Sequence, residues 1–195
     1  MILLARHGET QWNVERRMQG HMDSPLTERG RRQAQAVARL VRDLTRREAG
    51  AWRLVSSPLG RAHATAAMIA EATGLPLETD DRLKEVTCGP WEGRLWDEVA
   101  AHHQLQVERK RWIFEALGGE SYESVEARVT SFLADLDPEP SRRVIAVSHG
   151  ASGRVLRGVY ARLTRDEVYE LDIPQDAVHR LQNGQIDRFD CESVD

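Results

Sequence analysis

Leu3-Leu4-Ala5-Arg6-His7-Gly8-Glu9-Thr10 is the stretch that decides the fold, and Val144-Ile145-Ala146-Val147-Ser148-His149-Gly150 repeats its pattern. Each is a short apolar run that ends in a His-Gly pair, which is typical of a buried parallel strand that stops at the glycine. In an open α/β sheet, ligands bind beyond the carboxyl ends of such strands. The two stretches therefore predict that two histidines and an arginine lie at one edge of a parallel sheet.

Strand-like and helix-like segments alternate along the rest of the chain. Short apolar runs predict strands at 1–5, 52–56, 77–79 and 144–148. Apolar residues at spacings of three and four predict helices over 27–44, 57–74, 122–136 and around 155–159. In the second helix, Ser57 is the expected N-cap and Pro58 the first helical residue. The tail predicts a hairpin of 178–181 and 186–189 that turns at Asn183-Gly184.

This alternation predicts an α/β fold: a single-domain, three-layer sandwich over 1–195, with a mostly parallel sheet and helices on both faces. The segment 80–120 is less regular, apart from a helical piece around 95–102, and we expect it to cover the strand ends. Arginines crowd the 29–47 part of the first helix. We interpret them as a solvated helix face rather than a nucleic-acid surface.

Composition limits the classes of partner. The chain has 195 residues, 41% of them hydrophobic, and a net charge of −4, which argues against general binding of nucleic acid or anionic membranes. We find no apolar run of membrane-spanning length and no targeting pattern before the first strand, so a cytoplasmic location is expected. Cys88 and Cys191 make neither a disulfide framework nor a metal cage. Because the net charge is negative, any anion site must depend on a local cluster of basic side chains.

Candidate anion-binding side chains follow the predicted strand ends. Arg6 and His7 are neighbours, so an extended backbone sends their side chains in opposite directions. Arg61 falls in the first turns of a helix whose N-terminus favours negative charge. Two arginines, two histidines and a helix N-terminus suit a phosphoryl group, with a histidine as nucleophile and a carboxyl as proton carrier. The candidate set is Arg6, His7, Asn13, Gln19, Gly20, Arg61, Glu85 and His149.

Each candidate also has a purely structural interpretation. The histidines can be satisfied core residues, and Arg61 can cap a helix or pair with a carboxylate. Asn13 can order its loop, and Gln19 and Gly20 can shape a turn. Other carboxyls compete with Glu85 for the role of proton carrier, above all Glu78, Asp80, Asp81 and Glu92. We expect His21 to face solvent and assign no role to His63, His102, His103 and His179.

A second phosphate motif competes with the histidines. Cys88 through Arg94 spells C-x5-R, the spacing of cysteine-dependent phosphatases, in which backbone N–H groups hold phosphate and a thiolate attacks. Pro90 removes one of those donors, and Glu92 places a carboxylate beside the anion. We therefore predict that Cys88 is a small filler near the pocket.

The ordered motifs closely resemble those of the histidine phosphatase superfamily, the phosphoglycerate-mutase-like proteins, and its phosphatase branch in particular. They run in family order from Leu3 to about Leu156. The matching strings are Arg6-His7-Gly8-Glu9-Thr10 with Asn13, Gln19-Gly20, Asp23, Pro25-Leu26-Thr27 with Gly30, Ser56-Ser57-Pro58-Leu59-Gly60-Arg61-Ala62 with Thr65-Ala66, Arg82-Leu83 with Glu85, Gly89-Pro90-Trp91-Glu92-Gly93, Gly118-Gly119-Glu120-Ser121 and Ser148-His149-Gly150.

The resemblance implies a role for each matched residue. His7 is the expected nucleophile that becomes phosphohistidine, and Glu85 is expected to protonate the leaving alkoxide and then to activate water. Arg6, Arg61 and His149 are expected to line the phosphate pocket, with Asn13, Gln19, Gly20 and Gly150 around it. The arginines neutralise the charge that spreads over the phosphoryl group, so we expect no metal and no cofactor.

The resemblance also implies a variable substrate cap around 86–122. It contains Trp91, Trp96, Trp112 and Phe114, which can contact a ring or an apolar tail, and Arg109, Lys110 and Arg111, which can bind a second anion. The alternative is a solvated helix with tryptophans packed below it.

The motifs are compatible with three functions. The first is a phosphomonoester hydrolase that acts on a small phosphorylated metabolite. A phosphoglycerate-mutase-type isomerase is the alternative, although its relatives carry a longer segment between the proton carrier and the second histidine. A silent phospho-ligand binder is disfavoured because a binder needs neither His7 nor Glu85. No oligomeric state is predicted.

Overall fold

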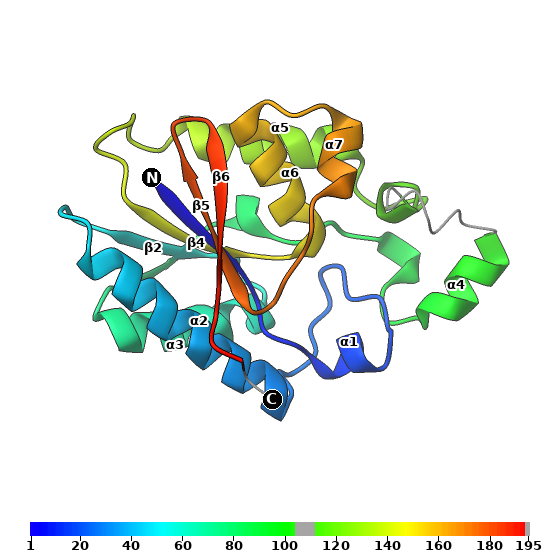
Figure 1. Cartoon of the computed structure of the whole chain (residues 1–195). Helices are drawn as coiled ribbons and strands as arrows, with labels where there is room; N and C mark the ends of the chain where they lie inside the picture. Colours follow the sequence, from blue (N-terminus) through cyan, green and yellow to red (C-terminus); the bar gives the residue numbers. More distant parts are fainter. Residues whose placement is uncertain (104–111, 194–195) are drawn as a thin grey trace.

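The computed structural model describes residues 1–103 and 112–193, and its centre is one six-stranded sheet in the order β3-β2-β4-β1-β5-β6 (Figure 1). The first four strands in sequence pair in parallel, and the last two form an antiparallel hairpin on β1. Their bounds are β1 Ile2–Arg6, β2 Arg53–Ser56, β3 Leu77–Thr79, β4 Val144–Ser148, β5 Ala177–Gln182 and β6 Gln185–Asp190. The predicted fold class is confirmed, and β3 and β4 have the predicted bounds.

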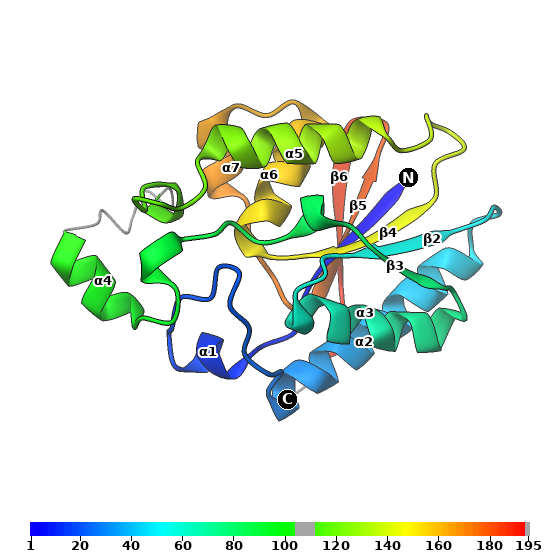
Figure 2. The same cartoon turned by 180° about the vertical axis from the view of Figure 1, so that it is seen from behind.

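Helices cover both faces of the sheet, because successive side chains of a strand point to opposite faces and the central strands β1 and β4 are apolar on both. Ile2 and Leu4 of β1 belong to one buried cluster, and Leu3 and Ala5 belong to another. The first cluster includes residues of α5 (Tyr122–Ala134), α6 (Gly150–Ala161) and α7 (Arg165–Glu170), and the second includes residues of α2 (Glu28–Arg46) and α3 (Gly60–Thr73). Figures 1 and 2 show these two helical layers on opposite sides of the sheet.

The start of α3 differs from the prediction. The helix begins at Gly60, so Ser57 is not its N-cap and Pro58 is not its first residue. The carboxylate of Asp23, which lies in a distant loop, accepts the amides of Gly60 (2.5 Å) and Arg61 (3.3 Å) instead. A side chain far away in the sequence therefore caps this helix.

The irregular segment lies beside the loop that follows β1 (Figure 2). It contains η1 (Asp81–Leu83), η2 (Gly89–Trp91), α4 (Trp96–His103) and η4 (Trp112–Phe114), and the loop contains the short α1 (Gln11–Val14). A small apolar cluster joins the two parts through Met18, Cys88, Trp91, Val99 and Ala116. Neither α1 nor α7 was predicted, since each is too short to show an apolar periodicity; a capping box holds the N-terminus of each. Among the helices that the structure describes, none is long and apolar enough to cross a membrane.

Candidate active site

Strand pairing brings the two histidines together. Arg6 ends β1 opposite Ser148, which ends β4, and the His7 amide donates to the Ser148 carbonyl over 3.2 Å. His149 follows as the N-cap of α6, and the centres of the two imidazole rings lie 5.2 Å apart. Parallel strands therefore place both side chains at the same edge of the sheet, as the sequence predicts.

One nitrogen of His7 is held by the backbone. Its Nδ1 lies 2.8 Å from the Gly8 carbonyl oxygen, which can only accept, so Nδ1 carries the proton and donates. Nε2 then keeps its lone pair. Burial, assisted by the guanidinium groups of Arg6 and Arg61, holds the pKa of His7 well below its usual value. The imidazole is therefore neutral at neutral pH, the state that a nucleophile requires.

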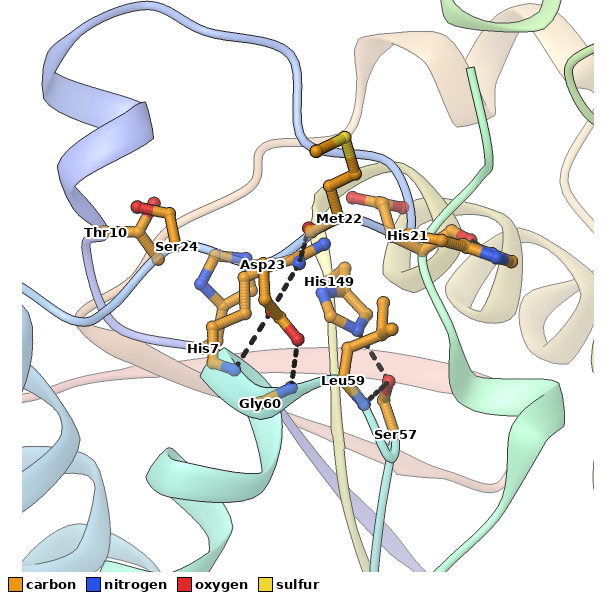
Figure 3. Close-up of polar contacts among 12 residues, drawn as sticks. His7, Thr10, His21, Met22, Asp23, Ser24, Ser57, Leu59, Gly60 and His149 are labelled. Carbon is orange, nitrogen blue, oxygen red and sulfur yellow. Dashed lines mark hydrogen bonds and ion pairs between the residues drawn. The ribbon is translucent and has the colours of Figure 1, made fainter. Parts of the chain in front are cut away.

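His149 is as buried as His7 and is held by Ser57. Its Nε2 is 2.8 Å from the Ser57 hydroxyl, which also accepts the Leu59 amide at 3.3 Å (Figure 3). Burial and the charge of Arg61 hold the pKa of His149 well below its usual value. Ser57, the residue expected to cap α3, thus contacts the second histidine instead. It can do so because it directly follows β2 at the same edge of the sheet.

The two arginines are fixed by main-chain carbonyl groups. Arg6 donates through Nη1 to the Ile173 carbonyl at 2.6 Å, and burial lowers the pKa of its guanidinium to about 10. Arg61 donates to the carbonyl groups of Met22 and Gly20, each at 2.8 Å, and pairs with Asp23 at 2.8 Å. Arg61 therefore pairs with a carboxylate, as its structural interpretation predicts, and its side chain also lines the cavity.

Glu85 is held at the N-terminus of α6. Its carboxylate accepts the amides of Ser152 at 2.9 Å and Ala151 at 3.2 Å, and that of Val86 at 3.0 Å. Helix N-termini favour a negative charge in this position. The competing carboxyls are used elsewhere: Glu92 accepts from Thr87 and Cys88, and Asp80 pairs with Arg82. Of Glu85 and these competitors, Glu85 is the one that lines the cavity.

The loop after β1 contributes three of the candidates. The Asn13 carbonyl oxygen accepts from the Thr10 amide and from Gln175, each at 3.1 Å, so its NH2 group is the part left to face a ligand. Asn13 thus orders its loop and lines the cavity together with Gln19. Gly20 has φ +50°, and a Cβ there would lie 2.1 Å from the Glu92 carboxylate. Gly20 therefore shapes a turn whose carbonyl binds Arg61.

One cavity of about 560 Å³ unites the predicted site residues other than His149. It is lined by Arg6, His7, Asn13, Gln19, Gly20, Arg61, Glu85 and Gly150. Arg6 and His7 reach it together, because the strand ends at Arg6 and the expected alternation does not continue to His7. His149 lies behind them and lines a smaller cavity of about 20 Å³. Several buried side-chain atoms here have no hydrogen-bond partner among residues 1–103 and 112–193: Arg6 Nε, Gln19 Oε1, Arg61 Nε, His149 Nδ1 and Arg154 Nε.

The sequence reasoning missed part of the cavity wall. Trp12, Ile113, Arg154 and Ile173 also line it, beside Trp96 and Trp112 of the predicted cap, whose ring centroids lie 4.1 Å apart. Arg154 had no periodic signal, since it follows His149 by five positions, whereas residues three or four apart share one face of a helix. Ile173 had none, because it comes from a distant segment without periodicity. Arg109, Lys110 and Arg111 lie outside the described residues.

The surroundings of Cys88 do not suit a nucleophile. Burial, followed by the carboxylates of Glu92 and Glu85, raises the pKa of its thiol to about 12. A thiolate is the reactive form, so this environment suppresses cysteine chemistry. Its side chain is 1% exposed and packs with Trp91 and Met18, as expected for a small filler near the pocket. His21 is exposed, as expected, although its Nε2 lies 2.9 Å from the Glu85 carbonyl oxygen.

The fold and the site together define an α/β protein with two histidines, two arginines and a carboxylate at the carboxyl edge of its sheet. The sequence model of the histidine phosphatase superfamily (branch 1) matches residues 2–191, and the chain belongs to this superfamily. The resemblance seen in the sequence is thus confirmed. Enzymes of this superfamily include phosphatases and mutases.

Named relatives fall on both sides of that division. The chain is 40% identical over 153 residues to a probable phosphoglycerate mutase, GpmB, of Salmonella paratyphi A, covering 76% of this chain and 69% of the relative. It is similar to a mycobacterial glucosyl-3-phosphoglycerate phosphatase solved with VO3, with a TM-score of 0.81, 30% identity and coverage of 98% and 99%. The Bacillus stearothermophilus protein YhfR gives a TM-score of 0.78 at 28% identity, covering 99% and 98%.

Proposed function

We propose that the protein is a metal-independent phosphomonoester hydrolase that transfers the phosphoryl group of a small phosphorylated metabolite to His7 and then to water. The observation that carries this proposal is the Nδ1 hydrogen bond of His7, which leaves the Nε2 lone pair available beside Arg6 and Arg61. Glu85 lines the same cavity, which favours turnover over silent binding. We expect the enzyme to work in the cytoplasm on a soluble metabolite, without nucleic acid or membrane as partner.

The chemistry proceeds in two displacements. In the first, His7 Nε2 attacks phosphorus, the ester P–O bond breaks, and protonated Glu85 gives its proton to the departing alkoxide. In the second, Glu85 takes a proton from water as the water oxygen attacks phosphorus and the P–N bond breaks, which releases inorganic phosphate. Arg6, Arg61, His149 and the Asn13 NH2 group stabilise the charge on the other phosphoryl oxygens.

Hydrolysis is preferred to the mutase reaction for two reasons. A mutase must keep water from the phosphohistidine while the substrate turns over, which calls for a closing cap. The segment between Glu85 and His149 is short for that task, and one solved relative with nearly complete mutual coverage is named a phosphatase. The tryptophans on the outer wall favour a metabolite whose organic part offers a ring or an apolar face.

A time course by phosphorus NMR tests hydrolase against mutase. The substrates are 3-phosphoglycerate with a catalytic amount of 2,3-bisphosphoglycerate, and separately a panel of simple phosphomonoesters, all with EDTA present. We expect steady release of inorganic phosphate and little 2-phosphoglycerate. Rapid formation of 2-phosphoglycerate with much slower phosphate release would show a mutase instead. Activity that EDTA abolishes and a divalent cation restores would contradict the metal-independent route.

A further inference from the structure

The segment 171–176, which joins α7 to β5, contacts two of the predicted phosphate ligands. The Ile173 carbonyl accepts from Arg6 Nη1 at 2.6 Å, and Gln175 donates from Nε2 to the Asn13 carbonyl oxygen at 3.1 Å. Ile173 also lines the large cavity. The position of this segment therefore sets the direction in which Arg6 and Asn13 present their remaining N–H groups.

A buried arginine of α6 holds the segment in place. Arg157 is 3% exposed; its Nη1 donates to the Asp172 carboxylate at 2.8 Å, and its Nη2 donates to the Asp172 main-chain carbonyl. Arg188 of β6 pairs with the other carboxylate oxygen of Asp172. Two separate elements thus fix the residue that immediately precedes Ile173.

His179, to which the sequence assigned no role, completes this contact. Its Nε2 lies 2.8 Å from Arg157 Nη1, which only donates, and 3.3 Å from the Asp172 carboxylate. The shorter contact makes the imidazole a neutral acceptor. The small cavity of about 20 Å³ is lined by Arg157, His179, Ile173, Arg6 and His149 together. The network therefore lies directly behind the predicted phosphate ligands.

We propose that Arg157 and Asp172 are positioning residues for the active site: they hold the Ile173 carbonyl so that Arg6 is aimed at the phosphoryl oxygens. The same helix, α6, binds Glu85 at its first turn, so one rigid element aligns both the anion-binding arginine and the proton carrier. This inference rests on the proposed function in that it takes the cavity to be a phosphate site. Neither residue contacts the substrate.

The test measures binding of orthovanadate by calorimetry at neutral pH, without turnover. Asp172→Asn, which keeps the shape of the side chain, is expected to weaken binding about 10-fold or more, because small misplacements at such sites are costly. Arg157→Lys is the second variant, and it covers the case in which Asp172→Asn does not fold. Asp187→Asn is the matched control, since Asp187 is a half-exposed carboxylate of the same β5–β6 hairpin and pairs with Arg180 at 2.7 Å. Urea unfolding of each variant establishes that it is folded.

A double-mutant cycle separates positioning from a general structural effect. In an Arg6→Ala background, Asp172→Asn is expected to change vanadate affinity by less than about 2-fold, since the group it orients is gone. Equal losses in the two backgrounds, or affinity like that of the unmodified chain in both folded variants, would overturn the inference. If the cycle behaves as expected while no ester is hydrolysed, the proposed function fails and the positioning role stands. Failure of the unmodified chain to bind vanadate would overturn both.

Discussion

At the scale of single residues, the chemistry depends on which nitrogen of His7 keeps its lone pair. Because the Gly8 carbonyl holds Nδ1, the phosphoryl group is expected on Nε2. Rapid quenching with labelled substrate is expected to give an acid-labile, base-stable adduct on the peptide that contains His7. His7→Ala is expected to lose the adduct and to slow turnover by about 10⁴-fold or more. His63→Ala, at an exposed position on α3, is the control. Full activity of His7→Ala would exclude this mechanism.

The role of Glu85 can be tested through the leaving group. Proton donation matters most when the departing alkoxide is a strong base, so Glu85→Gln is expected to slow alkyl phosphates about 10²–10⁴-fold and p-nitrophenyl phosphate much less. Steady-state rates on both substrates measure the difference. Glu78→Gln serves as the control, since Glu78 is exposed and pairs with Arg53. Equal losses on the two substrates would indicate that Glu85 only positions other groups.

At the scale of elements, β5 carries a buried imidazole whose protonation opposes folding. Burial, followed by the charge of Arg157, lowers the pKa of His179 to about 4, whereas the unfolded chain has the ordinary value near 6.5. The unfolded state therefore binds the proton first, so the stabilisation is complete above about pH 6.5 and is lost as pH falls toward 4. For His179 alone the loss is about 3 kcal/mol. His7 and His149 act in the same direction.

Urea unfolding between pH 4.5 and 7.5 measures this effect. The free energy of unfolding of the unmodified chain is expected to rise with pH over this range, and that of His179→Gln is expected to rise less. Identical pH dependence in the two proteins would show that His179 titrates normally in the folded chain.

At the scale of the whole molecule, the two apolar layers share one sheet and are expected to unfold together. Ile69 lies on α3 below the sheet and Phe132 on α5 above it, both 2% exposed or less. Replacing either with Ala is expected to cost about 2–5 kcal/mol of unfolding free energy in a single transition. Tryptophan fluorescence and far-UV circular dichroism check that the transitions coincide. Leu117→Ala, at an 86% exposed side chain, is the control. Two separate transitions would show that the two layers unfold independently.

Much of the fold and the centre of the site could be predicted from the sequence, because both depend on local patterns. Apolar runs that stop at glycine define β1 and β4, and parallel pairing of such strands brings Arg6, His7 and His149 to one edge. Glu85 and Arg61 were found through their motifs, and they line the predicted cavity. The sequence by itself therefore determined the fold class and most of the charged groups around His7.

Tertiary structure alone decided how those groups are held. Asp23 rather than Ser57 caps α3, Ser57 contacts His149, and Gln175 contacts Asn13 across 162 positions of the chain. The main-chain carbonyl of Ile173 binds Arg6, and a carbonyl group carries no signature in the residue type. Contacts of this kind join segments that are remote in sequence and lack periodicity. They form only when the sheet has brought its strand ends together, so no local sequence pattern predicts them.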